Sequence, residues 1–359
     1  MSLLTTRIDL GAIAHNTRMM KQSAGGARLM CVVKANAYNH GVERVVPVMQ
    51  EAGADAFAVA TFAEAAVVRK LTRLPVLAWL WAPGEDIPED IEIAAPSLAH
   101  LHALADAHVR GPVHLKVDTG MNRAGIDEED WDEAFGFAAE AGLNVVGLMS
   151  HLACADEPDA EYNDVQADTF RRAIAVARRH GLAVEVNHLA NSPATLARPD
   201  LRFNQVRDGV ALYGLEPIDG RDSGLRPAMS WVATVLAVRR VHAGEGVSYG
   251  LTWRAPTDGW TAVISAGYAD GVARAWQGHL AAGIGGQQYP QVGRVCMDQF
   301  VVWLGDNPAG VEPGEEAVIF GAGGMSATEL ATRAGTINYE VVCSPTGRTE
   351  RTYLQEGTR

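Results

Sequence analysis

Residues 29–41 read LMCVVKANAYNHG, in which an apolar run from Leu29 to Val33 is followed directly by Lys34 and then by small and polar residues. A short run rich in β-branched and apolar side chains predicts a buried strand, and the Asn and Gly residues after it predict a loop. The segment is the first unit of a strand–turn–helix pattern, and the repetition of that pattern decides the fold.

Eight such apolar runs occur in the first two thirds of the chain. They are Leu29–Val33, Phe57–Ala60, Val76–Leu80, Ile91–Ala94, Val113–Val117, Val145–Met149, Val184–Val186 and Phe203–Val206. The stretches between them have helical spacing, for example Thr61–Leu71 and Asp164–His180, with Gly181 as a C-terminal stop. Alternating strands and helices imply parallel βα units, and eight of them predict a closed (β/α)₈ barrel of the TIM type.

The sequence changes character after about Pro227. Strand-like runs punctuated by Gly, Pro and Asp follow, at Trp231–Val241, Trp260–Ser265, Gln299–Leu304 and Glu316–Phe320. Only Ala327–Ala334 has a helical pattern, behind a Ser326 cap. A length of 359 residues also favours two domains. We therefore expect a barrel over residues 1–227 and a mostly β domain over residues 228–359.

Composition and charge exclude several classes of partner. Apolar residues make up 48% and charged residues 20%, and the formal net charge is −13. An acidic surface repels phosphodiesters and anionic lipids, so neither nucleic acid nor a membrane is expected to bind. The four cysteines are too far apart in sequence for a zinc or redox motif, and no secretion signal is apparent, so we expect a cytoplasmic protein without a metal site.

Functional groups in a (β/α)₈ barrel gather at the C-terminal ends of the strands. The predicted strand ends carry Lys34 to Tyr38, Lys116 to Arg123, Ser150-His151, Asn191-Ser192 and Arg207-Asp208-Gly209. Together they predict a cationic pocket with hydroxyl and backbone donors, which suits an anionic ligand.

Individual residues at these strand ends allow more than one interpretation. Lys34 leaves an apolar strand, so partial desolvation is expected to lower its pKa and to favour Schiff-base chemistry with an aldehyde; a side chain that reaches the rim for solvation is an equal alternative. Ser192 and Gly209 follow strands seven and eight, where such barrels hold phosphate, although both also suit ordinary turns. Arg207 is compatible with a ring nitrogen, a carboxylate or a structural ion pair, and His151 alone is better explained as a core histidine.

Nine segments in order resemble the alanine racemases, which are fold-type III pyridoxal phosphate enzymes. They are KANAYNHG (34–41), DTGMNRAG (118–125), SHLACADE (150–157), NSPAT (191–195), VRDGVALYG (206–214), VSYG (247–250), GYADG (267–271), VGRVCMDQ (292–299) and INYEV (337–341). Each segment alone is a modest signal, but nine in family order across nearly the whole chain are specific. The resemblance implies racemisation of alanine with pyridoxal 5′-phosphate, in a homodimer that supplies D-alanine for peptidoglycan.

The same resemblance implies residue roles. Lys34 would carry the cofactor and act as one catalytic base, and Tyr249 of the partner subunit would be the other. The remaining cofactor-site residues are Tyr38, Asn191, Ser192, Gly209, Val210 and Tyr339 around the phosphate, Arg207 at the pyridine nitrogen, and His151 linking Tyr249 to Arg207. Arg123 and the Met297 backbone would meet the substrate carboxylate, Tyr268 would narrow the substrate pocket, and Lys116 matches a position that is carbamylated in some members.

Two positions depart from the pattern of the family. Asn39 stands where the family often has glycine, and Asp208 where it often has proline. Asp208 could weaken the contact of Arg207 with the cofactor ring if it pointed the same way, and we expect it to point away.

Competing functions remain open from the sequence. The same resemblance also admits an amino-acid racemase of broader substrate range, a fold-type III decarboxylase, against which Arg207 argues, and a non-catalytic cofactor carrier, against which the β domain argues. A metal-dependent barrel hydrolase is suggested only by His100 and His102, which have no second cluster of metal ligands.

Overall fold

The computed structural model describes residues 2–354 and divides them into two compact units. One unit comprises Ala12–Arg226. The other combines residues 2–11 with residues 227–354. The expected boundary at Pro227 agrees with this division, but the expected assignment of the first residues to the barrel does not. Strand β1 (Leu4–Asp9) pairs with β9 (Met229–Val241) and β17 (Glu350–Leu354), so the start of the chain is part of the β unit.

The barrel unit contains a parallel sheet in the order β7-β6-β5-β4-β3-β2-β8. Its strands are β2 (Arg28–Val32), β3 (Ala56–Val59), β4 (Val76–Ala78), β5 (Glu92–Ala95), β6 (Val113–Lys116), β7 (Val145–Met149) and β8 (Gln205–Asp208). Nearly all of their residues are buried, as expected for parallel strands covered by helices. Seven of the eight predicted runs thus coincide with or overlap a strand.

The run Val184–Val186 is not a strand, and the barrel is closed there by less regular chain. His188 forms a bridge with Met149 of β7, and its N–H donates to the Leu148 carbonyl at 3.0 Å. On the other side, Arg207 N–H of β8 donates to the Ala190 carbonyl at 2.9 Å. A Cβ on Gly147 would overlap the Val186 carbonyl, so the two backbones approach closely at this point. The prediction was therefore wrong about the seventh of the eight strands, while the barrel architecture holds.

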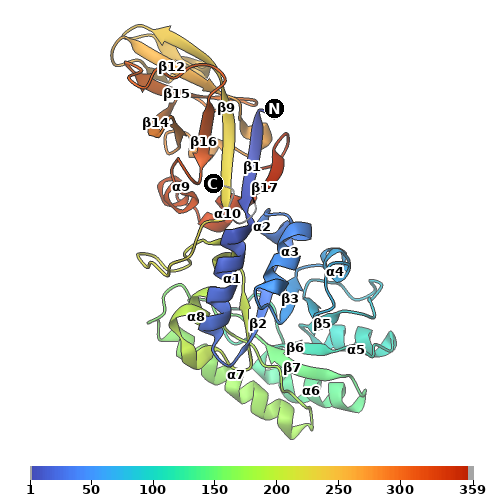
Figure 1. The fold of residues 1–359 in the computed structure, drawn as a ribbon. Coiled ribbons are helices and arrows are strands. Elements are labelled where there is room, and N and C mark those ends of the chain that lie inside the picture. Colours follow the sequence, from blue (N-terminus) through green and yellow to red (C-terminus); the bar gives the residue numbers. More distant parts are fainter. Residues whose placement is uncertain (1, 355–359) are drawn as a thin grey trace. The chain divides into compact units, whose positions relative to one another are not determined.

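Helices connect and flank these strands (Figure 1). They are α1 (Leu10–Ala24), α2 (Lys34–Tyr38), α3 (Val42–Glu51), α4 (Phe62–Arg69), α5 (Leu98–Asp106), α6 (Trp131–Glu140), α7 (Tyr162–Arg179) and α8 (Ser192–Ala197). Helix α4 begins with a capping box in which Thr61 accepts from the Glu64 N–H and the Glu64 carboxylate accepts from the Thr61 N–H. Helix α7 is followed by Gly181 at a positive φ of 77°, which confirms the predicted stop.

The β unit is built on an eight-stranded sheet in the order β12-β15-β14-β13-β16-β9-β1-β17, with β12 also paired to β9. Besides β1, β9 and β17, its strands are β12 (Gly259–Ile264), β13 (Ala281–Ile284), β14 (Gln287–Val292), β15 (Phe300–Gly305) and β16 (Glu316–Phe320), and β10 (Gly246–Val247) pairs with β11 (Trp253–Arg254). Figure 1 shows β1 beside β9 and β17. Helix α9 (Ala327–Ala334) begins at the predicted Ser326 cap, whereas α10 (Asn338–Cys343) was not predicted.

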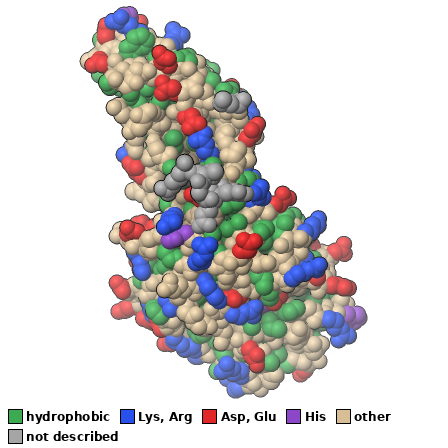
Figure 2. Space-filling view, in the orientation of Figure 1, with side chains coloured by type: hydrophobic (Ala, Val, Ile, Leu, Met, Phe, Trp, Pro, Cys, Tyr) green, Lys and Arg blue, Asp and Glu red, His purple; other side chains and the backbone are tan. Residues whose placement is uncertain are grey.

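The described surface carries charges of both signs. Acidic and basic side chains are interspersed over the face shown in Figure 2. None of the helices within residues 2–354 is long and apolar enough to span a bilayer.

Candidate active site

Lys34 lies at the C-terminal end of β2 and begins a segment with unusual backbone geometry. The next five residues, Ala35 to Asn39, all have positive φ angles between 51° and 65°, which is a left-handed turn. Left-handed conformation costs about 1–2 kcal/mol per residue for residues other than glycine. Five consecutive residues in this conformation are stable only where the surrounding structure constrains the backbone. Strained segments of this kind cluster at functional sites.

Side-chain hydrogen bonds to neighbouring elements hold this turn. The Glu64 carboxylate accepts from the Ala35 N–H at 2.7 Å, and the Asn36 side-chain oxygen accepts from the Val42 N–H at 2.8 Å. Asn39 ends the turn with φ 65° and ψ 12°. Asparagine is among the residues that tolerate this region best after glycine. The departure at position 39 is therefore compatible with the local backbone.

Tyr38, Ser192 and Gly209 come together from three separate segments. The Ser192 hydroxyl accepts from the Gly209 N–H at 2.9 Å, and both hydroxyl-bearing side chains are buried. A Cβ on Gly209 would collide with the Tyr38 hydroxyl, so only glycine leaves room for this approach. The Tyr38 ring stacks on Tyr213, with 4.7 Å between ring centroids. Two hydroxyls and a backbone N–H thus converge at the barrel end where phosphate is commonly held.

Asn191 and Val210 flank this group. Asn191 caps α8, its side-chain oxygen accepting from the Ala194 N–H at 3.4 Å. Val210 is almost fully buried and begins a short 3₁₀ turn after Gly209. Both residues thus lie beside the Ser192–Gly209 contact, and the Asn191 side chain supports the start of α8.

Four cationic side chains surround His151. Burial, and then the charges of Arg207, Arg123, Lys34 and Lys116, lower the pKa of His151 to about 3. The ring is therefore neutral at physiological pH. Burial followed by the charges of Arg123 and Arg207 also lowers the pKa of Lys116. Such a concentration of positive charge around one neutral ring favours an anionic ligand.

The loop that carries Arg123 is organised by Asp118. One carboxylate oxygen accepts from the Gly120 N–H at 2.7 Å and from the Asn122 N–H at 3.2 Å, and the other accepts from the Arg123 N–H at 3.2 Å. Tyr162 on α7 donates to the Gly120 carbonyl at 2.8 Å. These bonds fix the backbone of Arg123 while its side chain remains exposed.

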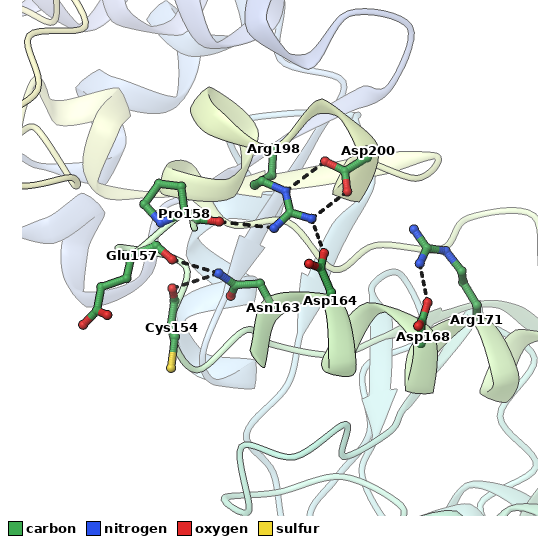
Figure 3. A network of polar contacts seen from close by, with 9 residues as sticks. All are labelled: Cys154, Glu157, Pro158, Asn163, Asp164, Asp168, Arg171, Arg198 and Asp200. Atoms are coloured by element: carbon green, nitrogen blue, oxygen red, sulfur yellow. Dashed lines mark hydrogen bonds and ion pairs between the residues drawn. The ribbon is translucent and has the colours of Figure 1, made fainter. Parts of the chain in front are cut away.

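A polar network on the outside of the barrel joins α7 to α8 (Figure 3). Arg198, directly after α8, donates to Asp164 of α7, to Asp200 at 2.8 Å and to the Pro158 carbonyl at 3.2 Å. Asn163 donates to the carbonyls of Cys154 and Glu157 at 3.1 and 3.0 Å. The loop after His151 and the helix that begins at Ser192 are therefore tied to one framework.

Arg207 is held by the barrel interior. Its guanidinium donates to the carbonyls of Ser150 and His188, to His188 Nδ1 at 3.0 Å and toward His151 Nδ1 at 3.3 Å. Burial lowers its pKa to about 10, so it remains charged. The next residue, Asp208, points away from this network, because its carboxylate accepts from Thr195 at 2.8 Å. It is nevertheless fully buried.

In the β unit, Tyr249, Tyr268 and Met297 lie on loops that pack against one another. Ser248, with a positive φ of 65°, donates to the Arg294 carbonyl at 2.7 Å, and the Ala269 N–H donates to the Met297 carbonyl at 3.0 Å. The three predicted side chains are respectively 70%, 44% and 52% exposed. The side chains are exposed although hydrogen bonds hold the loops that carry them, and exposed apolar groups of this size commonly mark an interaction surface.

Tyr339 lies on α10 and is half-buried. This helix packs against α9, and Asn338 donates to the Thr328 hydroxyl at 3.2 Å. Tyr339 is thus separate in sequence and element from the loops that carry Tyr249, Tyr268 and Met297.

Three residues near the predicted site were missed. Trp79 lies with its ring centroid 5.7 Å from Lys34 Nζ, and its place at the end of a predicted strand could have indicated this. His188 contacts Arg207, but the wrongly predicted seventh strand at Val184–Val186 obscured its position. Glu64, which supports the left-handed turn, gave no sequence signal beyond its capping role.

The histidines that suggested a metal site have other partners. His100 contacts Ser97 Oγ at 2.8 Å and the Trp81 carbonyl at 3.1 Å, and His102 packs on Phe137 with ring centroids 4.1 Å apart. Within residues 2–354 no group of three or more His, Cys, Asp or Glu side chains is arranged to bind a metal ion.

Comparison with known proteins gives two family matches, which follow one another along the chain and together cover most of it. Residues 8–217 match the family described as alanine racemase, N-terminal domain, and residues 228–353 match alanine racemase, C-terminal domain. An alanine racemase of Corynebacterium efficiens is 58% identical over 99% of this chain and 100% of its own length.

Solved structures of alanine racemases are similar to this chain over nearly its full length. The crystal structure of alanine racemase from Corynebacterium glutamicum has a TM-score of 0.91 at 52% identity, covering 99% of this chain and 100% of that one. Alanine racemase from Bartonella henselae with covalently bound pyridoxal phosphate has a TM-score of 0.89 at 25% identity, covering 99% and 100%. With both family domains matched in order and such identity over the full length, the chain belongs to the alanine racemase family.

Proposed function

We propose that this chain interconverts L-alanine and D-alanine with pyridoxal 5′-phosphate bound through Lys34, in a homodimer with shared active sites. The observation that carries the proposal is the group of four cations around the neutral His151, next to the converging donors of Tyr38, Ser192 and Gly209. A phosphorylated cofactor and an amino-acid carboxylate are both anions, and this end of the barrel suits both.

The residues present fit the cofactor. Tyr38, Ser192 and the backbone N–H of Gly209 would hold its phosphate, because they converge where any larger residue at position 209 would block the space. Arg207 would donate to the ring nitrogen, since its guanidinium stays protonated. When bound, the cofactor supplies an aldehyde that links to an amine and a conjugated ring that delocalises the electron pair left at the substrate Cα.

Racemisation requires a proton to leave one face of the substrate carbon and another to arrive at the opposite face. A single lysine tethered on one side reaches both faces poorly, so a second acid–base group is needed. We assign these roles to Lys34 and Tyr249. One of the pair removes the proton as a base, the other donates a proton from the opposite side, and the reverse reaction exchanges the roles.

The substrate carboxylate would be bound by Arg123 and by the Met297 backbone. Arg123 suits this role because its backbone is fixed by Asp118 while its side chain remains exposed. Burial, and then the charge of Arg123, lower the pKa of Lys116, which increases its neutral amine fraction. A neutral amine is the form that adds carbon dioxide, and a carbamate at Lys116 would orient Arg123.

A homodimer explains the exposed residues of the β unit. Tyr249, Leu251 and Met297 are each more than half exposed, although the loops that carry them are well packed. In a two-fold dimer, Tyr249 of each subunit would enter the active site of the other. This arrangement would bury the exposed apolar surface and complete the site. The predicted narrow pocket at Tyr268 would then select a small side chain.

The cellular role follows from the product. D-alanine is a building block of peptidoglycan, so we place the reaction in the cytoplasm. Cys31, Cys154 and Cys296 form no disulfide within residues 2–354, which suits a reducing compartment.

Borohydride reduction of the holoenzyme should fix the pyridoxyl group on Lys34. The chain has four lysines, Lys21, Lys34, Lys70 and Lys116, so peptide mapping by mass spectrometry assigns the label without ambiguity. A Lys116→Ala variant serves as a control and should be labelled at the same place. A label on any other lysine would refute the assignment.

Alanine should be the preferred substrate. Comparison of kcat/KM for alanine, serine, lysine and arginine by optical rotation should give alanine the highest value and serine a lower one, because bulk at the substrate β-carbon meets Tyr268. Lysine or arginine racemising faster than alanine would favour the broader-range racemase. Release of carbon dioxide from lysine would favour the decarboxylase.

A further inference from the structure

A line of four polar side chains crosses the interior of the barrel. Arg207 Nη1 lies 3.0 Å from His188 Nδ1, His188 Nε2 lies 2.9 Å from His114 Nδ1, and His114 Nε2 lies 2.9 Å from a carboxylate oxygen of Glu92. Both histidines are fully buried, and the Glu92 side chain is 17% exposed. Glu92 begins β5 and Arg207 lies near the end of β8, so the line runs from one end of the barrel to the other.

The two ends of this line fix the direction of every hydrogen bond. Arginine has only donors, so His188 Nδ1 must accept. His188 therefore carries its proton on Nε2 and donates to His114 Nδ1, which must also accept. His114 then carries its proton on Nε2 and donates to Glu92. Burial, reinforced by the charge of Arg207, lowers the pKa of His188 well below its ordinary value, which agrees with a neutral ring.

We propose that Glu92 is a positioning residue for Arg207, acting through a one-way hydrogen-bond chain in which His188 and His114 are both neutral and protonated on Nε2. The carboxylate is the acceptor that ends the chain. Its negative charge polarises both rings, so His188 Nδ1 becomes a stronger acceptor for the Arg207 guanidinium. The other groups that compensate the buried charge of Arg207 are carbonyls, the neutral His151 and, through its charge alone, the adjacent Asp208.

The chain of bonds is independent of the proposed function, whereas its kinetic consequence rests on the role of Arg207 at the cofactor ring. Glu92 contacts His114 at the opposite end of the barrel from Arg123. Loss of its charge should therefore lower kcat for alanine while KM changes little, because the carboxylate-binding residues are untouched.

The first test is spectroscopic and needs no turnover. In holoenzyme with ¹⁵N-labelled histidine, long-range ¹⁵N–¹H correlation should show both His114 and His188 protonated on Nε2 alone, with signals assigned through His114→Gln and His188→Gln variants. In Glu92→Gln the Nε2–H proton of His114 should move upfield, because its acceptor is no longer charged. A proton on Nδ1 of either ring in the wild type would overturn the proposal.

Matched variants separate charge from shape. Glu92→Gln keeps the size and removes the charge, and Glu92→Asp keeps the charge and removes a methylene. The proposal predicts that Glu92→Gln lowers kcat about tenfold and that Glu92→Asp retains more activity. Glu89→Gln, an exposed neighbour, should change nothing. The reverse order of the two Glu92 variants would indicate a role in packing alone.

A double-mutant cycle then tests whether Glu92 acts through Arg207. On an Arg207→Lys background, Glu92→Gln should lower kcat by less than about twofold, because the group it supports is already lost. An undiminished effect on that background would show that Glu92 does not act through Arg207, whatever the outcome for the proposed function.

Discussion

Mixing Lys34→Ala subunits with Tyr249→Phe subunits should restore about a quarter of wild-type activity, although neither variant alone is active. Loss of one acid–base group should lower the rate by roughly 10²–10⁴-fold, and loss of Lys34 removes the cofactor attachment as well. If each site combines Lys34 of one subunit with Tyr249 of the other, a mixed dimer contains one intact site and one doubly defective site. Free exchange makes half of the dimers mixed.

The measurement is the alanine racemisation rate after the variants have been unfolded and refolded together. Differently tagged subunits allow exchange to be verified by native mass spectrometry. A mixture of Lys34→Ala with Lys34→Arg is the matched control, and it should stay inactive because no combination supplies Lys34. Verified exchange with no recovery in the test mixture would show that Lys34 and Tyr249 do not meet across an interface.

Asp208 should make the barrel less stable as pH rises. Burial raises the pKa of Asp208 to about 7, although Thr195, Arg207 and Arg202 partly oppose this. Its second oxygen is buried and has no hydrogen-bond partner among residues 2–354. The unfolded chain therefore releases this proton at a lower pH than the folded chain. From about pH 4 to about pH 7 the unfolded state binds fewer protons, so stability falls as pH rises.

Comparison with Asp208→Asn isolates this contribution. The free energy of opening of the wild type, relative to the variant, should fall by about 3 kcal/mol between pH 5 and pH 8, because the amide does not titrate. Cys31, buried beside Asp208 on the neighbouring strand, provides a local probe. Its alkylation rate in the wild type divided by that in the variant should rise about 100-fold over this range.

The ratio cancels the pH dependence of thiol reactivity itself, and peptide mapping separates Cys31 from the other cysteines. Asp106→Asn, an exposed position on α5, is the control and should give a ratio that does not change with pH. A constant ratio for Asp208→Asn would mean that Asp208 has a similar pKa in the folded and unfolded chain.

The barrel could be predicted because its strands are apolar runs of nearly uniform length. The failure at the seventh run has a physical cause: Val184 and Val186 are β-branched, yet the segment that closes the barrel centres on Asn187 and His188. These polar residues are buried because they bond to other elements, for example Asn187 Oδ1 to the Leu148 N–H at 3.0 Å. The pattern of hydrophobic residues in a sequence does not show which buried polar side chains have hydrogen-bond partners on other elements.

The candidate site was predictable where it follows directly from strand ends. Lys34, Arg207 and Gly209 occupy such positions, whereas Ser192 follows the irregular segment at Val184–Val186. The motifs extended the set to the β unit. The left-handed turn after Lys34 was not predictable, because Ala and Tyr favour other conformations and external bonds from Glu64 stabilise it. Glu92 was equally hidden, since its relation to Arg207 passes through two rings, one on β6 and one on the irregular segment that closes the barrel.

The pairing of β1 with strands at the other end of the chain imposes an order on biosynthesis. Leu4, Thr6 and Ile8 are buried in the finished sheet, but β9 begins about 220 residues later and β17 about 340 residues later. At about 5–20 residues per second, the nascent strand would wait roughly 10–40 s for its first partner and longer for its second. During translation the segment with the earliest opportunity to fold is therefore among the last to do so, and an unpaired edge emerges from the ribosome ahead of the barrel.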